Sequence, residues 1–147
     1  VAVRDGSGNL VANLFTGTAT QAQYADLAEK YTTKEEYPVG TIMTVVKADQ
    51  EESIDAEMEA CGEGEIPCGV ISEKPAYLMN AEADGQAVAL KGRVPVRVEG
   101  LIVKGEPIYT AMDGIGNQDN RHGTLIGIAL ENDDKDGEKL VEVFLKV

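Results

Sequence analysis

The sequence contains no tryptophan, a single histidine and two cysteines in 147 residues, and aromatic residues make up only 5% of it. Two cysteines cannot build a disulfide framework, and with one histidine they supply too few ligands for a structural zinc site. Bases are also scarce: 13 lysines and arginines face 26 acids, for a net charge of −13. A chain of this charge repels phosphate backbones, which argues against nucleic acid as a partner. No apolar run approaches the roughly 20 residues that cross a bilayer, so no membrane partner is expected.

Residue patterns typical of catalytic sites are missing as well. His122 lies in a polar loop, and no cluster of partners for acid-base chemistry surrounds it in the sequence. Ser72 lacks the G-x-S-x-G context of an activated nucleophile, and a capped turn accounts for it better. No glycine-rich phosphate loop is present. The sequence therefore predicts a protein that is not an enzyme, with no catalytic residue and no cofactor.

One acidic turn imitates the beginning of a calcium-binding loop. Asn132, Asp134, Asp136 and Gly137 follow the N-x-D-x-D-G order. However, Val143 occupies the twelfth position, where such a loop needs a bidentate glutamate. A hairpin turn with solvated carboxylates is therefore the preferred interpretation, and no metal site is predicted.

What the sequence does contain favours a single, mainly β domain. Apolar residues make up 43% of the chain, and its 16 glycines suit strands that are joined by tight turns. The expected fold is a small antiparallel β-barrel or β-sandwich of about eight strands. Gly69 and Gly127 lie inside apolar runs, where glycine marks a bulge or a close approach of two backbones. The clearest strands are expected at 41–46, 87–90, 93–98, 124–130 and 139–147.

Three local features add to this pattern. Strands 87–90 and 93–98 could also be one long strand that bends at Lys91 and Gly92. Within that stretch, Pro95 has no N–H to donate and predicts an edge position or a bulge. Cys68 lies in an apolar run and is expected to be buried.

A short helix is predicted over residues 20–36. Tyr24, Leu27, Ala28 and Tyr31 follow the i, i+3, i+4, i+7 spacing of one helical face, and Thr20 is a suitable N-cap. A helix of about three turns is marginal alone and has to pack against the rest of the domain.

Residues 1–20 differ in composition from the acidic body at 21–147. They carry one base and one acid, together with the large apolar residues Leu10, Val11, Leu14 and Phe15. Because exposing four such side chains to water is costly, we predict an extended arm whose apolar residues bind a partner chain. The alternative is an ordinary first hairpin of the domain.

The body contains a weak internal repeat, over about residues 38–98 and 104–147. Each half has a strand that begins after a glycine, a polar loop, a strand with an internal glycine, a turn and an alternating strand. The repeat suggests two similar β units that close on each other.

The chain contains, in order, the motifs Y-A-D-L-A-E-K-Y at 24–31, P-V-G-T at 38–41, G-V-I-S-E-K-P-A-Y-L-M-N at 69–80 and G-R-V-P-V at 92–96. This order of motifs resembles a module of tailed-bacteriophage virion proteins. The second half of the chain, with K-G-E-P-I-Y at 104–109 and G-T-L-I-G-I-A-L at 123–130, also resembles the small β-barrel proteins that decorate phage capsids.

The resemblance implies a non-enzymatic virion component, often a homotrimer, with a decoration-protein or β-tulip-like fold. It favours a capsid decoration (cement) protein that is assembled in the host cytoplasm and stabilises the major capsid protein lattice from the capsid exterior. The arm would then anchor it through its four apolar residues. Tyr77, Leu78, Met79 and Tyr109 are candidates for subunit contacts, with core packing as the alternative for the two tyrosines.

Two other functions stay open at this point. The same module also occurs in tail-fibre, spike and baseplate proteins, where it would serve host adhesion. Some of those proteins carry self-cleaving chaperone domains, although the sequence shows no recognisable cleavage dyad. The absence of a long repetitive stalk favours the capsid surface.

Overall fold

The computed structural model describes residues 3–11, 25–48, 56–119 and 121–147. These residues form ten strands and one short 3-10 helix, so the prediction of a mainly β fold is confirmed. None of their helical segments is long and apolar enough to span a membrane. The elements are β1 (Asp26–Tyr31), β2 (Ile42–Val45), β3 (Met58–Ala60), β4 (Gly69–Ile71), β5 (Tyr77–Met79), β6 (Gln86–Val98), β7 (Pro107–Thr110), η1 (Met112–Gly114), β8 (Gly116–Asn117), β9 (Leu125–Ala129) and β10 (Lys139–Leu145).

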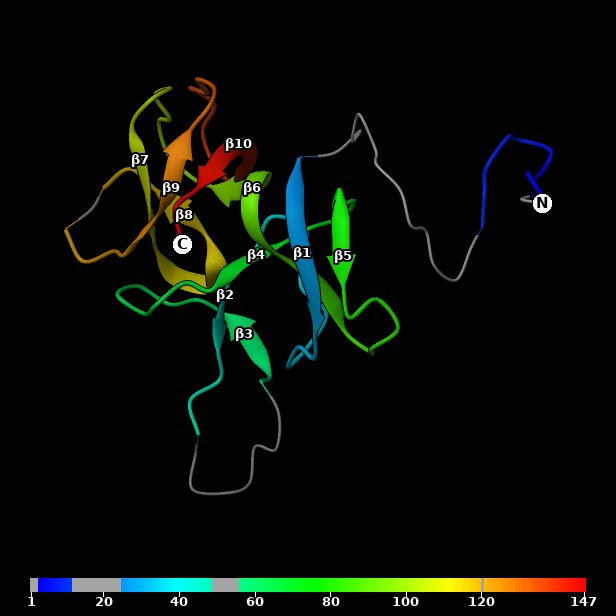
Figure 1. Ribbon diagram of the computed structural model, residues 1–147. Helices are drawn as coiled ribbons and strands as arrows, with labels where there is room; N and C mark the ends of the chain where they lie inside the picture. The colour runs from blue at the N-terminus through cyan, green and yellow to red at the C-terminus, as the bar shows by residue number, and fades with distance from the viewer. Residues whose placement is uncertain (1–2, 12–24, 49–55, 120) are drawn as a thin grey trace.

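Five strands close into a small barrel, which is visible on the left of Figure 1. The order is β10, β9, β7, β8 and β6, and β6 pairs with β10 to complete the circle. All of these pairs are antiparallel except β6 with β8, which meet in parallel at Val98 and Gly116. Closure removes the free edges that an open sheet would expose.

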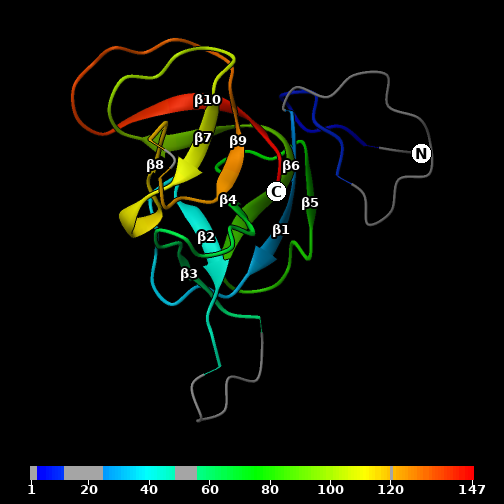
Figure 2. The same cartoon turned by 90° about the vertical axis from the view of Figure 1, so that its left-hand side faces the viewer.

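A second sheet shares the long strand β6 with the barrel. Its order is β5, β1, β6, β4, β2 and β3, and Figure 2 shows these strands beside and below the barrel. Strand β6 is one continuous strand, as the alternative reading of 87–98 predicted. It changes sheets near Gly92, where a φ of +104° suits glycine and disfavours other residues.

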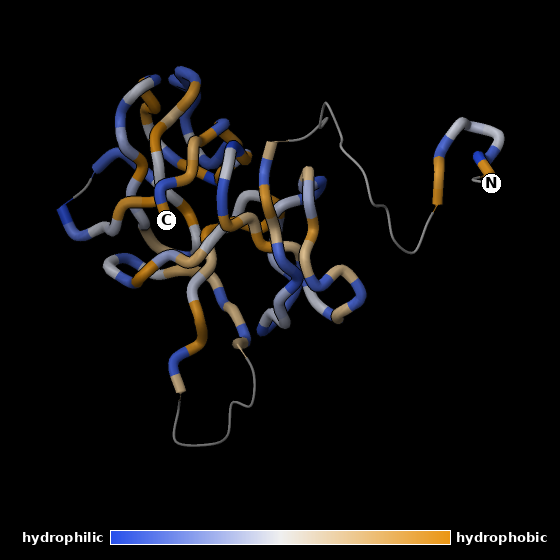
Figure 3. Tube along the Cα trace, viewed as in Figure 1, coloured by the Kyte–Doolittle hydropathy of each residue, from blue (hydrophilic) through white to orange (hydrophobic). Residues whose placement is uncertain are grey.

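The core has two parts that follow from the alternation along the strands. The larger cluster fills the barrel, and β10 illustrates how: Val141, Val143 and Leu145 point inward while Leu140 and Phe144 face outward. A smaller cluster of Met43, Met58, Ile71 and Val88 lies on the other side of the second sheet. Figure 3 shows the orange apolar positions alternating along the strands.

The helix predicted over residues 20–36 is wrong where the structure describes it, because 26–31 form β1. In β1 the side chains of Asp26 and Ala28 are buried and Leu27 is exposed, which is the two-residue period of a strand. The strand pairs with β6 over six positions and with β5 over three. These hydrogen bonds outweigh the weak preference of a three-turn helix.

The glycines inside the apolar runs do allow close backbone approach, as predicted. A Cβ at Gly69 would lie 2.5 Å from the carbonyl oxygen of Ala89 on β6. A Cβ at Gly127 would collide with the carbonyl oxygen of Phe144 on β10. Both glycines therefore let a neighbouring strand pack against a bare backbone.

The two halves of the body share an order of strand pairing. In the first half, β2 pairs with β3 and β4, and β4 pairs with β6. In the second half, β7 pairs with β8 and β9, and β9 pairs with β10. Since β6 also pairs with β10, the last strands of the two halves lie side by side.

Candidate functional site

A cleft of about 220 Å³ opens where β6 passes from the second sheet into the barrel. On the side of β6 that faces away from β10, the Arg93 N–H donates to Ala25 and the Arg97 N–H donates to Gly40. Pro95 lies between these two residues and has no N–H to donate. Strand pairing on this side of β6 is therefore interrupted at Pro95, which agrees with the edge position predicted for this residue. Pro95 lines the cleft at this point.

A buried hydrogen bond lies in this cleft. The Ser72 hydroxyl donates to a carboxylate oxygen of Asp26 at 2.6 Å, and both residues are more than nine-tenths buried. Strand pairing brings them together, because the Ser72 N–H donates to Ala87 on β6 and the Ala76 N–H donates to the Asp26 carbonyl. The distance is at the short end of the range for O–H···O hydrogen bonds. The hydrogen bond ties the segment after β4 to β1.

The capped-turn explanation of Ser72 is therefore wrong, since its partner is 46 residues away along the chain. The sequence reasoning also missed Asp26 as a site residue. A signal was present: in a strand, Asp26 falls on the same face as the buried Ala28. The helical interpretation of 20–36 placed the two residues on different faces and hid it.

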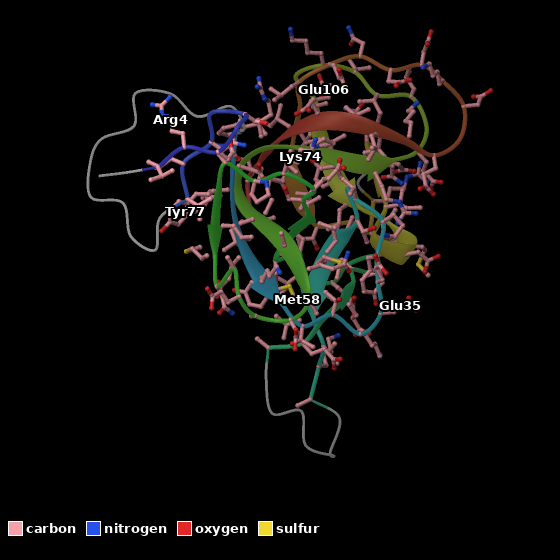
Figure 4. The ribbon with its side chains drawn as sticks, turned by 90° about the vertical axis from the view of Figure 1, so that its right-hand side faces the viewer. Arg4, Glu35, Met58, Lys74, Tyr77 and Glu106 are labelled. Atoms are coloured by element: carbon pink, nitrogen blue, oxygen red, sulfur yellow. The ribbon has the colours of Figure 1, made fainter. Side chains whose placement is uncertain are left out.

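The rest of the cleft is lined by charges of both signs. Glu73 and Lys74 follow Ser72 on one side, and Figure 4 shows Lys74 near the junction of the two sheets. Arg93 and Glu142 lie on the other side, with 3.8 Å between Nε and Oε2. No histidine lines the cleft. The arrangement offers polar and charged contacts for recognition, without a general base beside the serine hydroxyl other than Asp26.

The structure separates the predicted subunit-contact residues. Tyr77, Leu78 and Met79 form β5 at the margin of the second sheet, where Tyr77 is 65% exposed (Figure 4). Tyr109 is half-buried on β7 of the barrel. The four residues thus belong to two different sheets, and their role as contacts stays a prediction.

The predicted arm residues are only partly described. Residues 3–11 form a small turn in which the Asp5 carboxylate accepts the N–H groups of Ser7 and Asn9. Leu10 and Val11 are exposed. The other two predicted anchors, Leu14 and Phe15, lie outside the described residues.

The acidic turn uses its side chains internally. The side-chain amide oxygen of Asn132 accepts the Lys104 N–H. The Asp133 carboxylate accepts the Lys135 N–H and lies 3.4 Å from the Lys139 ammonium. Asp134 and Asp136 are both exposed at the surface of the turn. Within the described ranges, no group of three or more His, Cys, Asp or Glu side chains is placed to hold a metal ion.

The two cysteines lie on opposite sides of β2. The Cys61 N–H donates to Ile42 and the Cys68 N–H donates to Met43, and adjacent strand residues direct their carbonyls to opposite neighbours. The two cysteines are therefore separated by two interstrand spacings, about 9–10 Å in total, which is too far for a disulfide bond. Cys61 is buried, whereas Cys68 is only half-buried because it precedes β4, so the expectation of a buried Cys68 is wrong.

Thiol labelling should distinguish the two cysteines. Burial, together with the nearby Glu65 carboxylate, raises the pKa of Cys61 to about 12, so its thiol stays protonated and unreactive at pH 8. We expect iodoacetamide to modify one thiol, Cys68, in the native protein and both thiols in denaturant, as counted by intact mass. The Cys68→Ser variant should lose the rapid modification. Equal labelling rates at the two native thiols would contradict the structure.

The fold thus defines a class: a closed five-stranded barrel that shares one bent strand with a second sheet. No protein-family model and no curated protein matches the sequence. Among solved structures, the chain is similar to the pre-mature bacteriophage phi29 gene product 12, with a TM-score of 0.68 and 16% identity. That match covers 95% of this chain and 23% of the phi29 chain.

A second match narrows the region of similarity. It is to a C-terminal fragment of the same phi29 protein, with a TM-score of 0.64, 16% identity, 82% of this chain and 100% of the fragment covered. At this identity the likeness shows a shared fold. The chain spans less than a quarter of the longer phi29 polypeptide, so the fold there is one part of a larger protein.

Proposed function

We propose that this chain is a structural module of a tailed-phage virion and works by binding other virion proteins. The observation that carries the proposal is the fold shared with phi29 gene product 12 over 95% of the chain. The motifs at 24–31 and 69–80, which resemble phage virion modules, support it independently. The net charge of −13 fits a protein that does not contact the packaged nucleic acid.

The first candidate within this class is a capsid decoration protein. It would bind the major capsid protein on the capsid exterior as a homotrimer, with residues 1–20 as the anchor. The exposure of Leu10 and Val11 supports this use of the arm, because apolar side chains of that size gain free energy when a partner covers them. Many weak contacts repeated by symmetry would add up to stable attachment.

The second candidate is a module of a tail-fibre, spike or baseplate protein that takes part in host adhesion. One observation favours it: the fold makes up 23% of the phi29 chain, so in that protein it occurs as one module of a long polypeptide. A module of this kind would be present in few copies at the tail.

Imaging of virions that carry an epitope-tagged copy tests the proposal and separates the candidates. Gold label over the head, with hundreds of copies per particle, is the expected result for a decoration protein, and label on the tail with few copies is the result for an appendage module. A chain without residues 1–18 should fold but no longer co-purify with particles if the arm is the anchor. Absence of the tagged protein from purified particles would overturn the proposal.

The proposal of a binding role also predicts a stable covalent chain. Ser72 and Asp26 are hydrogen-bonded in the cleft, so self-cleavage is the reaction to test. We expect the intact mass to stay constant during long incubation at neutral pH. A cleavage that occurs in the wild type and stops in Ser72→Ala would overturn the non-enzymatic role.

A further inference from the structure

An apolar row crosses the outer face of the barrel. Pro107 on β7 lies opposite Ile128 on β9, Ile128 opposite Phe144 on β10, and Phe144 opposite Arg93 on β6. Directly opposed residues of neighbouring strands point to the same face. Phe144 is 44% exposed, and Pro107 and Ile128 are half-buried beside it, so the row presents chiefly an aromatic ring to solvent.

Two bases, Lys146 and Arg93, lie beside Phe144, and a third, Lys91, lies near the end of the chain that follows β10. The Lys146 ammonium lies 5.2 Å from the centroid of the Phe144 ring. The Lys91 ammonium donates to the main-chain oxygen of Val147, two residues beyond the end of β10. Arg93 lies beside the ring and is 3.8 Å from Glu142, a distance too long for a strong ion pair.

Two other bases, Arg97 and Lys34, are held closely by acids. Arg97 lies 2.6 Å from Glu138 and lowers the pKa of that carboxyl, and Lys34 lies 2.8 Å from Glu59. In a chain with a net charge of −13, three bases near an exposed aromatic ring are a local concentration of positive charge, with Glu142 beside it on the same face of β10. Its charge is complementary to carboxylates, and its apolar row is complementary to an apolar side chain.

We propose that the Phe144 surface, defined here as Pro107, Ile128, Phe144, Arg93, Lys91 and Lys146, binds an acidic polypeptide segment of a partner protein. An apolar side chain of the segment packs on the row, and its flanking carboxylates pair with the three bases. Strand β10 is paired on both sides, so the segment binds through side chains and adds no strand to the sheet. The inference rests on the proposed function only for the partner's location in a virion.

Peptide titrations test the surface without a virion. The probe is a short capped peptide in which glutamate alternates with leucine and phenylalanine, and the control peptide has lysine in place of each glutamate. We expect the glutamate peptide to shift backbone NMR signals of β9, β10 and the second half of β6 in the full chain. Added salt should weaken the binding, and the lysine peptide should not bind.

Matched variants locate the binding. The Phe144→Ser variant, and separately the double variant Arg93→Ser with Lys146→Ser, should bind the glutamate peptide at least about tenfold more weakly than the wild type. Met112→Ser and Lys104→Ser remove an exposed apolar residue and an exposed base elsewhere and should leave the affinity unchanged. Thermal unfolding of each variant shows whether the fold is retained, and every substituted side chain is at the surface.

Three results would overturn the inference. The first is the absence of shifts on β9, β10 and β6, or equal shifts with the lysine peptide. The second is binding of an uncharged oligosaccharide such as maltoheptaose at these residues when the peptide does not bind. The third is self-association of the purified chain that Phe144→Ser abolishes, because a second copy would then be the occupant. None of these results depends on where the protein lies in a particle.

Discussion

Replacing Gly92 with alanine is expected to lower the free energy of unfolding by about 3 kcal/mol or more. The residue has a φ of +104°, which strains any residue with a Cβ. That Cβ would also collide with the carbonyl oxygen of Ala25 and lie 3.0 Å from the Cα of Asp26. Both neighbours are backbone atoms of β1 and its first flanking residue, so neither can move without disturbing the strand. Urea denaturation monitored by circular dichroism measures the loss.

Gly105 supplies the matched control for this experiment. Its φ is +86°, but no atom lies within 4 Å of the position that a Cβ would take. Gly105→Ala should therefore cost only the conformational term, about 1–2 kcal/mol. Equal losses in the two variants would show that β1 does not approach β6 at the bend as closely as the structure has it.

The second large effect is expected in the barrel core. Ile126 is fully buried among the apolar side chains of the barrel, so Ile126→Ala leaves a cavity and should cost about 3–4 kcal/mol. The neighbouring Leu125 is 41% exposed on the outer face, and Leu125→Ala should cost less than about 1 kcal/mol. Urea denaturation of both variants, with unchanged m-values, measures the difference.

This pair of variants tests the direction in which β9 faces. A shift of one residue in the pairing of β9 would exchange the two side chains between core and surface. A larger loss for Leu125→Ala than for Ile126→Ala would therefore contradict the observed register of β9 with β7 and β10.

Local pattern predicted much of the barrel correctly. The strand at 139–147 alternates apolar and polar residues, and β10 buries the expected alternate residues. The glycines at 69 and 127 interrupt apolar runs and allow close strand packing. Such features depend on residues that are near one another in the chain, so the sequence alone reveals them.

The cleft could not be predicted in the same way. Its hydrogen bond joins Asp26 to Ser72 across 46 positions, and neither residue has a local motif that identifies the other. The residues at 26–31 satisfy a helical spacing as well as a strand alternation. Pairing with β6 and β5 decides between the two, and those partners lie more than 45 residues further along the chain.

By itself, the sequence determined that this protein is a mainly β, strongly acidic chain, because composition, charge and the two-residue period are local properties. Only the tertiary structure decided that β6 bends at Gly92 and belongs to two sheets, that β6 and β10 close the barrel, and that a cleft and a basic apolar surface result. These features depend on pairing between strands that are far apart in the sequence. A strand can form such hydrogen bonds only after its partner strand has reached the same place in the fold.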